Sequence, residues 1–212
     1  LGAMASSGLQ ALGISLCLLG LIAAVVCCVL PKWNQSSFVG ASIVTAQTHQ
    51  DGIWKNCVTQ STGQQQCKYY DSILALPSDI QAARALTVIS IVLSSLGLLL
   101  AVAGANFTTC LEDDGVKGKV ATGAGALLVL AGLLVLVPVS WSANVTISRF
   151  NDPLVADKRE IGTSIWVGWG AAGLLILGGA LLCCSWPRGG GAGSSYSAKY
   201  LSNSAGPART NV

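Results

Sequence analysis

Two cysteines in a long polar segment, Cys57 and Cys67, are the residues whose type and spacing most clearly suggest chemistry. The other six cysteines lie in or beside apolar stretches of the sequence. Nine residues separate the pair, and Gly63 marks a turn between them. This spacing suits a β-hairpin closed by a disulfide, which requires an oxidising compartment. The pair therefore predicts a disulfide and places its segment outside the cytosol.

The sequence lacks the residues that catalysis or metal binding would need. His49 is the only histidine, so a Cys/His zinc site is not credible. No histidine-based triad appears in the sequence either. There is no C-x-x-C motif, no phosphate-binding loop and no pair of carboxylates within an apolar run. We expect no enzyme activity, no cofactor and no bound metal.

Composition indicates that the elements around the cysteine pair are membrane helices. Hydrophobic residues make up 52% of the chain and charged residues only 10%, whereas a soluble protein carries about 25% charged residues. This excludes an ordinary soluble enzyme, a disordered scaffold and, with a net charge of +3, a nucleic-acid binder. Four uncharged runs are each long enough to cross about 30 Å of hydrocarbon as a helix. We expect the spans at 9–30, 84–105, 120–143 and 161–186.

Four spans leave both ends of the chain on the same side of the membrane. The positive-inside rule does not decide which side, because basic residues are distributed almost evenly. The cysteine pair decides it: we expect loops 31–83 and 144–160 outside, and loop 106–119 and both termini in the cytosol. Residues 1–7 are expected to be a cloning remnant and the cytosolic N-terminus. Residues 187–212, rich in Gly and Ser, are expected to form a disordered cytosolic tail.

Three cysteines, Cys110, Cys183 and Cys184, lie at the cytosolic ends of the predicted spans. Cysteines in this position are candidates for palmitoylation. The alternative is that they are inert small apolar residues.

Small residues also recur at four-residue spacing within the spans, which predicts close helix packing: Ser90/Ser94, Gly97/Ala101, Ala121/Gly125 and Gly168/Ala172.

The long outer loop has the pattern of a small β-sheet. Residues 42–46 and 52–54 are strand-like runs, and Ser78 with Asp79 offers an N-cap for the second span. Because a two-stranded ribbon alone is marginal, we expect three or more strands held by the disulfide. The predicted fold class is a membrane α+β protein: a left-handed four-transmembrane-helix bundle that carries an extracellular antiparallel β-sheet with one disulfide.

The outer loop contains Trp33, then Gly52-Ile53-Trp54, and then Cys57 and Cys67. This pattern resembles the W…G-L-W…C…C signature of the claudins, the tetraspan proteins of tight junctions. Further matches run through residues 60–64, 66–68, 74–77, 80–86, 138–141 and 158–162. Peripheral myelin proteins and γ-type calcium-channel subunits share the core signature, so an accessory channel subunit or a peripheral-myelin-like protein is the alternative. The sequence departs from the family pattern at Ile53, in the second outer loop and at the C-terminus.

The resemblance implies that the protein polymerises into strands with itself and with other claudins, in cis and in trans, at tight junctions of the plasma membrane. It also implies that the residue after the second cysteine, Lys68, lines the ion path between cells. Lys55 adds a second positive charge. We therefore expect a barrier that excludes cations, as in the barrier-type claudins that carry lysine at the position of Lys68. The alternative is that Lys68 forms an exposed ion pair with Asp71.

The remaining candidates are contact sites and structural residues. Trp33, Trp54 and Arg84 are expected to hold the sheet on the bundle, where the tryptophans also contact membrane lipids. Four apolar residues are candidates for protein contact: Ile73, Leu74, Leu154 and Val155. For Ile73 and Leu74, contact with lipid is the alternative. The end Thr210-Asn211-Val212 has the form of a ligand for PDZ scaffold proteins. The altered second loop weakens the implied binding of clostridial enterotoxin.

Overall fold

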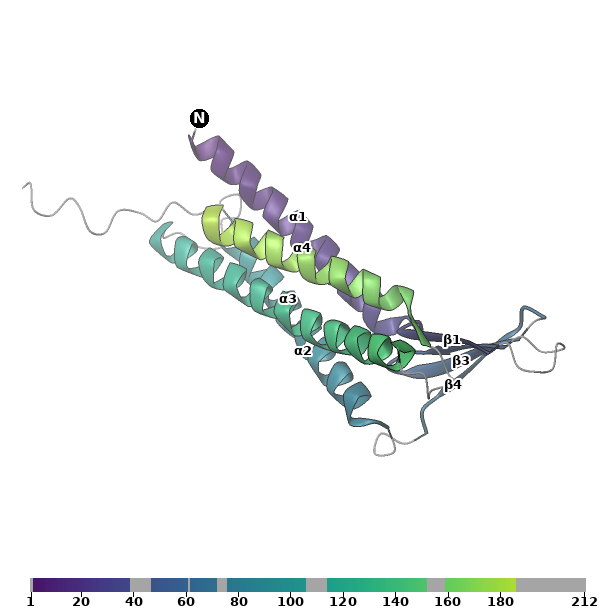
Figure 1. Ribbon diagram of the computed structural model, residues 1–212. Coiled ribbons are helices and arrows are strands. Elements are labelled where there is room, and N and C mark those ends of the chain that lie inside the picture. The colour runs from purple at the N-terminus through teal and green to yellow at the C-terminus, as the bar shows by residue number, and fades with distance from the viewer. Residues whose placement is uncertain are drawn as a thin grey trace, which may run out of the picture.

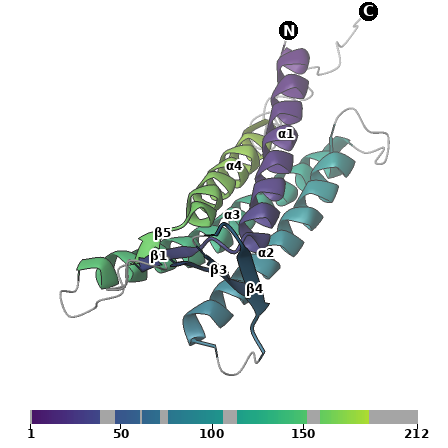
Figure 2. The same cartoon turned by 90° about the vertical axis from the view of Figure 1, so that its right-hand side faces the viewer.

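The computed structural model describes residues 2–38, 47–60, 62–71, 76–105, 114–151 and 159–185. The order of the elements along the chain is α1 (Gly2–Val29), β1 (Asn34–Phe38), β2 (Gln47–Asp51), β3 (Lys55–Thr59), β4 (Gln65–Tyr69), α2 (Ser78–Ala103), α3 (Asp114–Asn151), β5 (Arg159–Ile161) and α4 (Thr163–Ser185). The helices form a bundle, and the sheet lies at the end of it that is remote from the start of α1 (Figures 1 and 2). Four membrane-length helices, an antiparallel sheet and one disulfide, as the predicted fold class requires, are confirmed.

Within the described residues, four helices are long and apolar enough to cross a membrane. α1 packs on α4, α4 on α3 and α3 on α2, and a smaller contact between α1 and α2 closes the ring. The longest helix, α3, has 38 residues, which corresponds to about 57 Å at 1.5 Å per residue. Because this exceeds the roughly 30 Å of the hydrocarbon core, α3 extends beyond the membrane and packs beside β5.

Small residues on facing helices allow the bundle to pack closely. A Cβ atom on Gly125 would lie 2.8 Å from the carbonyl oxygen of Gly179, and one on Gly178 would lie 2.8 Å from that of Gly13. The Ser90 hydroxyl donates a 2.7 Å hydrogen bond from α2 to the carbonyl oxygen of Ala131 on α3. The small-residue pairs predicted from the sequence are all buried, so the prediction of close helix packing is confirmed.

The sheet has five antiparallel strands in the order β4-β3-β2-β1-β5. Its fifth strand comes from the connection between α3 and α4, so two separate loops of the chain contribute to one sheet. The disulfide joins Cys57 and Cys67, a directly opposed pair on β3 and β4 whose Cα atoms are 4.1 Å apart. The expectation of three or more strands held by this bond is confirmed.

Two local predictions within the long loop are wrong. Residues 52–54 are not a strand but the tight turn between β2 and β3, because tertiary contacts described below fix their backbone. Ser78 is the first residue of α2, and Pro77 occupies the N-cap position without a side-chain hydrogen bond. The strand-like run 42–46 lies outside the described residues.

Candidate functional site

Trp33 is the first of the residues that join the sheet to the bundle. Its side chain is buried, and its indole nitrogen Nε1 donates a 2.9 Å hydrogen bond to the carbonyl oxygen of Cys27 on α1. Its backbone nitrogen donates to the carbonyl oxygen of Asp51 on β2 at 3.0 Å, and its carbonyl oxygen accepts from the nitrogen of Gly162 at 2.9 Å. Trp33 therefore connects the end of α1 to the middle of the sheet and to the start of α4.

The turn between β2 and β3 is pressed against the bundle. The nitrogen of Gly52 donates to the carbonyl oxygen of Lys55 at 3.0 Å, which closes the turn. A Cβ atom on Gly52 would lie 2.5 Å from the Cα atom of Pro31, so a side chain has no room there. The next residue, Ile53, is buried in the same core cluster as Trp33. Glycine is required at this position because two backbone segments approach each other closely.

Arg84 lies near the start of α2 and fixes the turn from the other side. Its Nε donates a hydrogen bond to the carbonyl oxygen of Ile53. Its guanidinium carbon is 4.9 Å from the ring centroid of Trp54 and 5.6 Å from that of Tyr70, within the range of cation–π attraction. The Tyr70 hydroxyl donates to the carbonyl oxygen of Gly52 at 3.2 Å. We call Ile53, Trp54, Tyr70 and Arg84 the Arg84 cluster.

Sequence reasoning found three members of the Arg84 cluster and missed Tyr70. The Nε1 atom of Trp54 also donates to the sulfur of Cys28 on α1 at 3.3 Å, so the cluster reaches two helices. Tyr70 follows β4 directly, where nothing in the local pattern separates it from its exposed neighbour Tyr69. Its place beside Arg84 depends on the register of the sheet, which a local pattern does not contain.

The outer edge of the sheet holds the expected charge site. The Nζ atom of Lys68 on β4 lies 2.7 Å from the Oδ2 atom of Asp71, and both side chains are about three-quarters exposed, at 78% and 76%. The hydrogen bond that the Lys68 ammonium donates to Asp71, followed by the negative charge of that carboxylate, raises the pKa of Lys68 above its ordinary value. Lys68 therefore stays positively charged at neutral pH, and its charge is partly compensated by the paired carboxylate.

The second expected charge, Lys55, lies on the opposite face of the sheet. Lys55 pairs with Tyr69, and Asn56 pairs with Lys68. Because neighbouring residues of a strand point to opposite faces, the two lysine side chains diverge. The Nζ atom of Lys55 lies 6.0 Å from the ring centroid of Tyr69. The structure therefore brings Lys68 together with Asp71, not with Lys55.

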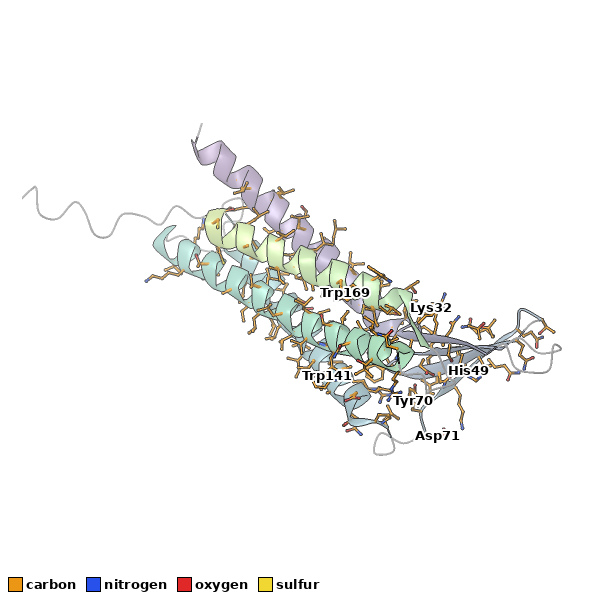
Figure 3. The ribbon with its side chains drawn as sticks, viewed as in Figure 1. Lys32, His49, Tyr70, Asp71, Trp141 and Trp169 are labelled. Carbon is orange, nitrogen blue, oxygen red and sulfur yellow. A yellow bond between two sulfur atoms is a disulfide. The ribbon has the colours of Figure 1, made fainter. Side chains whose placement is uncertain are left out.

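The face of the sheet that carries Lys68 is hollowed. A depression of about 520 Å³ on this face takes in His49, Asn56, Gln66, Lys68, Tyr70 and Asp71, and Figure 3 shows His49, Tyr70 and Asp71 along the sheet. The buried Oδ1 atom of Asn56 has no hydrogen-bond partner within the described parts of the chain.

Several of the candidate residues predicted from the sequence lie outside the described residues, whereas the candidate cysteines Cys183 and Cys184 lie within them. The undescribed candidates are Ile73, Leu74, Leu154, Val155, Cys110, Thr210, Asn211 and Val212. At the end of α4 remote from the sheet, Cys184 is exposed, and the sulfur of Cys183 lies 3.6 Å from the carbonyl oxygen of Thr122. Across the described ranges, no three His, Cys, Asp or Glu side chains are grouped closely enough to hold a metal ion.

Comparison with known proteins relates this architecture to one family. The sequence model of the PMP-22/EMP/MP20/Claudin family matches residues 7–182. Claudin-4 of Homo sapiens is 56% identical over 199 residues, which cover 93% of this chain and 94% of that protein. Claudin-4 of Bos taurus is 54% identical over 211 residues, covering 99% and 100%. Claudin-3 of Canis lupus familiaris is 58% identical over 184 residues, covering 86% and 84%.

Proposed function

This chain belongs to the PMP-22/EMP/MP20/Claudin family, and on that premise we propose that it is a tight-junction adhesion protein that polymerises into strands. Between neighbouring cells, these strands form a charge-selective barrier that excludes cations. The observation that carries the proposal is a disulfide-linked five-stranded sheet, fixed to one end of four membrane-length helices by Trp33, Gly52 and the Arg84 cluster. The identity of more than half of the aligned residues to claudin-4 and claudin-3 supports it.

The proposed orientation places the sheet outside the cell and both termini in the cytosol, at the plasma membrane. The disulfide supports this orientation because structural disulfides persist in oxidising compartments. The start of α1 and the end of α4 lie at the opposite end of the bundle from the sheet (Figure 1). On the cytosolic side, Cys110, Cys183 and Cys184 are proposed palmitoylation sites, and Thr210-Asn211-Val212 is a proposed ligand for PDZ scaffold proteins.

The proposed partners outside the cell are further copies of the chain and other claudins, in cis and in trans. Ile73, Leu74, Leu154 and Val155 are the proposed contact residues. They belong to the connections that lead away from β4 and into β5, the two edge strands of the sheet. Clostridial enterotoxin is a further candidate ligand through the second outer loop.

A homotypic contact assay tests this function. Cells without tight junctions express the chain with one of two fluorescent labels and are mixed with cells that express none. We expect the protein to concentrate where two expressing cells meet, in both colours, and not where an expressing cell meets a silent one. An even distribution that changes only when a channel protein is co-expressed would instead identify an accessory channel subunit.

Charge selectivity is proposed to depend on Lys68 and its pairing with Asp71. A fixed charge beside a narrow wet path attracts ions of opposite sign and repels those of its own sign. In an epithelial layer we expect Lys68→Asp to shift the Na⁺/Cl⁻ permeability ratio toward Na⁺ by roughly threefold, because the substitution reverses the sign of a fixed charge beside the path. Asp71→Asn, which removes the compensating carboxylate, should shift the ratio toward Cl⁻.

Dilution potentials across the layer measure both shifts. Lys119→Asp is the matched control, because Lys119 is an exposed lysine at the end of α3 remote from the sheet. If Lys68→Asp and Lys119→Asp gave the same potential as the unchanged chain, the assignment of Lys68 would be wrong.

A further inference from the structure

His49, the only histidine of the chain, lies on the same face of the sheet as Lys68. His49 on β2 pairs with Val58 on β3, and Asn56, two residues before Val58, pairs with Lys68 on β4. Because residues two apart on a strand point to the same face, His49 and Lys68 share one face. Both residues line the depression of about 520 Å³ on that face. An ion path that runs beside Lys68 therefore also passes His49.

The charges that line the depression cancel when His49 is neutral. Within the part of the chain that the structure describes, the lining holds one lysine, Lys68, and one carboxylate, Asp71, which form an ion pair of 2.7 Å. The other lining residues are two amides, two tyrosines, a valine and a disulfide-bonded cysteine, which carry no charge at neutral pH. Protonation of His49 therefore changes the net charge of the lining from zero to positive.

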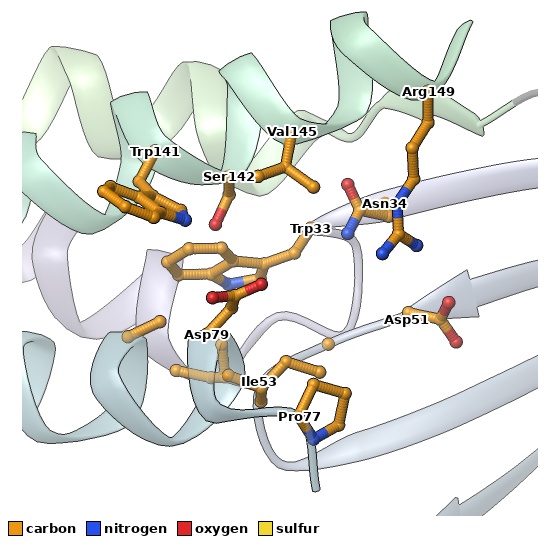
Figure 4. Close-up of a pocket in the computed structure, with 13 residues that line it drawn as sticks. Trp33, Asn34, Asp51, Ile53, Pro77, Asp79, Trp141, Ser142, Val145 and Arg149 are labelled. Carbon is orange, nitrogen blue, oxygen red and sulfur yellow. The ribbon is translucent and has the colours of Figure 1, made fainter. Parts of the chain in front are cut away.

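Two further charged residues stand at register positions of the same face. Asp51, two residues after His49 on β2, lines the separate cavity of about 100 Å³ between the sheet, α2 and α3 (Figure 4). On the other side of His49, its partner Ser36 on β1 pairs in turn with Arg159 on β5. Asp51 and Arg159 have opposite charges and together add no net charge. The net charge of the face therefore follows the protonation of His49.

Histidine is the side chain that ordinarily changes its charge between about pH 5 and pH 8. Aspartate side chains ordinarily titrate near pH 4, and lysine and tyrosine side chains near pH 10. As the pH falls through this range, an imidazole gains a proton and a positive charge, whereas lysine and aspartate side chains keep their charges. The net charge of the depression therefore becomes more positive at lower pH.

We propose that His49 is a second residue that determines ion selectivity at this face, and that it makes the selectivity depend on pH. In mildly acidic solution the imidazolium adds its charge to that of Lys68, and cations are excluded more strongly, because a fixed charge beside a wet path repels ions of its own sign. In mildly alkaline solution the neutral imidazole adds no charge. This inference rests on the proposed function, since it takes the depression beside Lys68 as part of the ion path.

Dilution potentials at two pH values test the role of His49. An epithelial layer that expresses the full-length chain is measured with both baths at about pH 8 and then at about pH 6, the range in which histidine changes its charge. We expect the Na⁺/Cl⁻ permeability ratio to fall roughly twofold, as a unit charge about 8 Å from an ion in water would produce. His49→Gln should give one ratio at both pH values, and His49→Lys should give one lower ratio at both.

The matched control moves the histidine to the other face of the sheet. Gln50 is the next residue on β2 and points to the opposite face, so His49→Gln combined with Gln50→His keeps the composition of the chain and should remove the pH dependence. A twofold pH response that persists in this double variant or in His49→Gln would overturn the inference and leave the proposed barrier intact. A layer whose resistance and selectivity do not change on expression would contradict the proposed function itself, and the inference with it.

A titration that needs no cell layer tests the surroundings of His49 separately. The full-length chain in detergent, with isotope-labelled histidine, gives one histidine signal that NMR follows as the pH changes. We expect Lys68→Gln to raise the midpoint of this titration by roughly 0.3 pH unit and Asp71→Asn to lower it by a similar amount, because they remove opposite charges from the depression. Lys119→Gln, at the end of α3 remote from the sheet, should not move the midpoint. The same midpoint in all four proteins would show that His49 does not share the depression with the ion pair, and would overturn the inference.

Discussion

Replacing Gly162 with alanine is expected to prevent the sheet from docking on the bundle. A Cβ atom at this position would lie 1.9 Å from the carbonyl oxygen of Lys32 and 2.7 Å from that of Trp33. Both are backbone atoms, so no side-chain rotation relieves the overlap. The backbone would have to separate, which would break the hydrogen bonds from Gly162 to Trp33 and from Ser164 to Lys32. We expect a loss of more than about 4 kcal/mol of unfolding free energy, in the range of severe core substitutions.

Surface biotinylation and size-exclusion chromatography of detergent-solubilised protein measure this loss. Gly162→Ala should give aggregated protein that is retained inside the cell. Gly170→Ala is the matched control, because a Cβ atom on Gly170, also near the start of α4, has nothing within 4 Å. A monodisperse Gly162→Ala protein at the cell surface, with a thermal midpoint equal to that of Gly170→Ala, would show that the close approach of residues 32 and 162 is not required.

Loss of the Arg84 guanidinium is expected to have the second largest effect. Arg84→Gln removes the charged hydrogen bond to Ile53 and the contacts with Trp54 and Tyr70. A hydrogen bond from a charged group contributes about 1.5–3 kcal/mol, and a cation–π contact contributes about 0.5–2 kcal/mol. We therefore expect a loss of about 2–4 kcal/mol. Arg84→Lys should restore little of it, because an ammonium group lacks the planar surface that lies against two rings.

Thermal unfolding in detergent and amide hydrogen exchange test the role of Arg84. Both variants should unfold at lower temperature, and exchange should rise in residues 47–60, which contain the turn that Arg84 holds. Lys119→Gln, at the far end of α3, controls for the loss of a positive charge. Arg84→Lys with the exchange pattern and midpoint of the unchanged chain would contradict the geometry of the Arg84 cluster.

The sequence was sufficient to predict features that depend on local physical requirements. Apolar runs of membrane length have to be helices, because the bilayer offers no water to backbone groups. The disulfide could be predicted because Cys57 and Cys67 stand apart from the membrane-embedded cysteines. The ion pair between Lys68 and Asp71, which are three residues apart, could also be predicted, as the alternative role of Lys68.

Features that depend on contacts between distant segments could not be predicted in this way. Residues 52–54 have strand-like composition, but contacts with Pro31 and Arg84 make them a turn. Tyr70 joins the Arg84 cluster only because of the register of β3 and β4. The cavity of about 100 Å³ between α2, α3 and the sheet gathers Trp33, Asp79 and Trp141 from three separate parts of the chain. No local pattern contains such a juxtaposition.

Freeze-fracture electron microscopy tests the central claim most directly, because it images polymers within the membrane. Cells that lack tight-junction strands express the full-length chain as their only family member, and contacts between expressing cells are fractured. The account predicts continuous, branching intramembrane strands at these contacts, and none in cells that express Gly162→Ala. Scattered particles without strands, from protein that reaches the cell surface with its Cys57–Cys67 disulfide formed, would contradict the claim that this chain polymerises by itself.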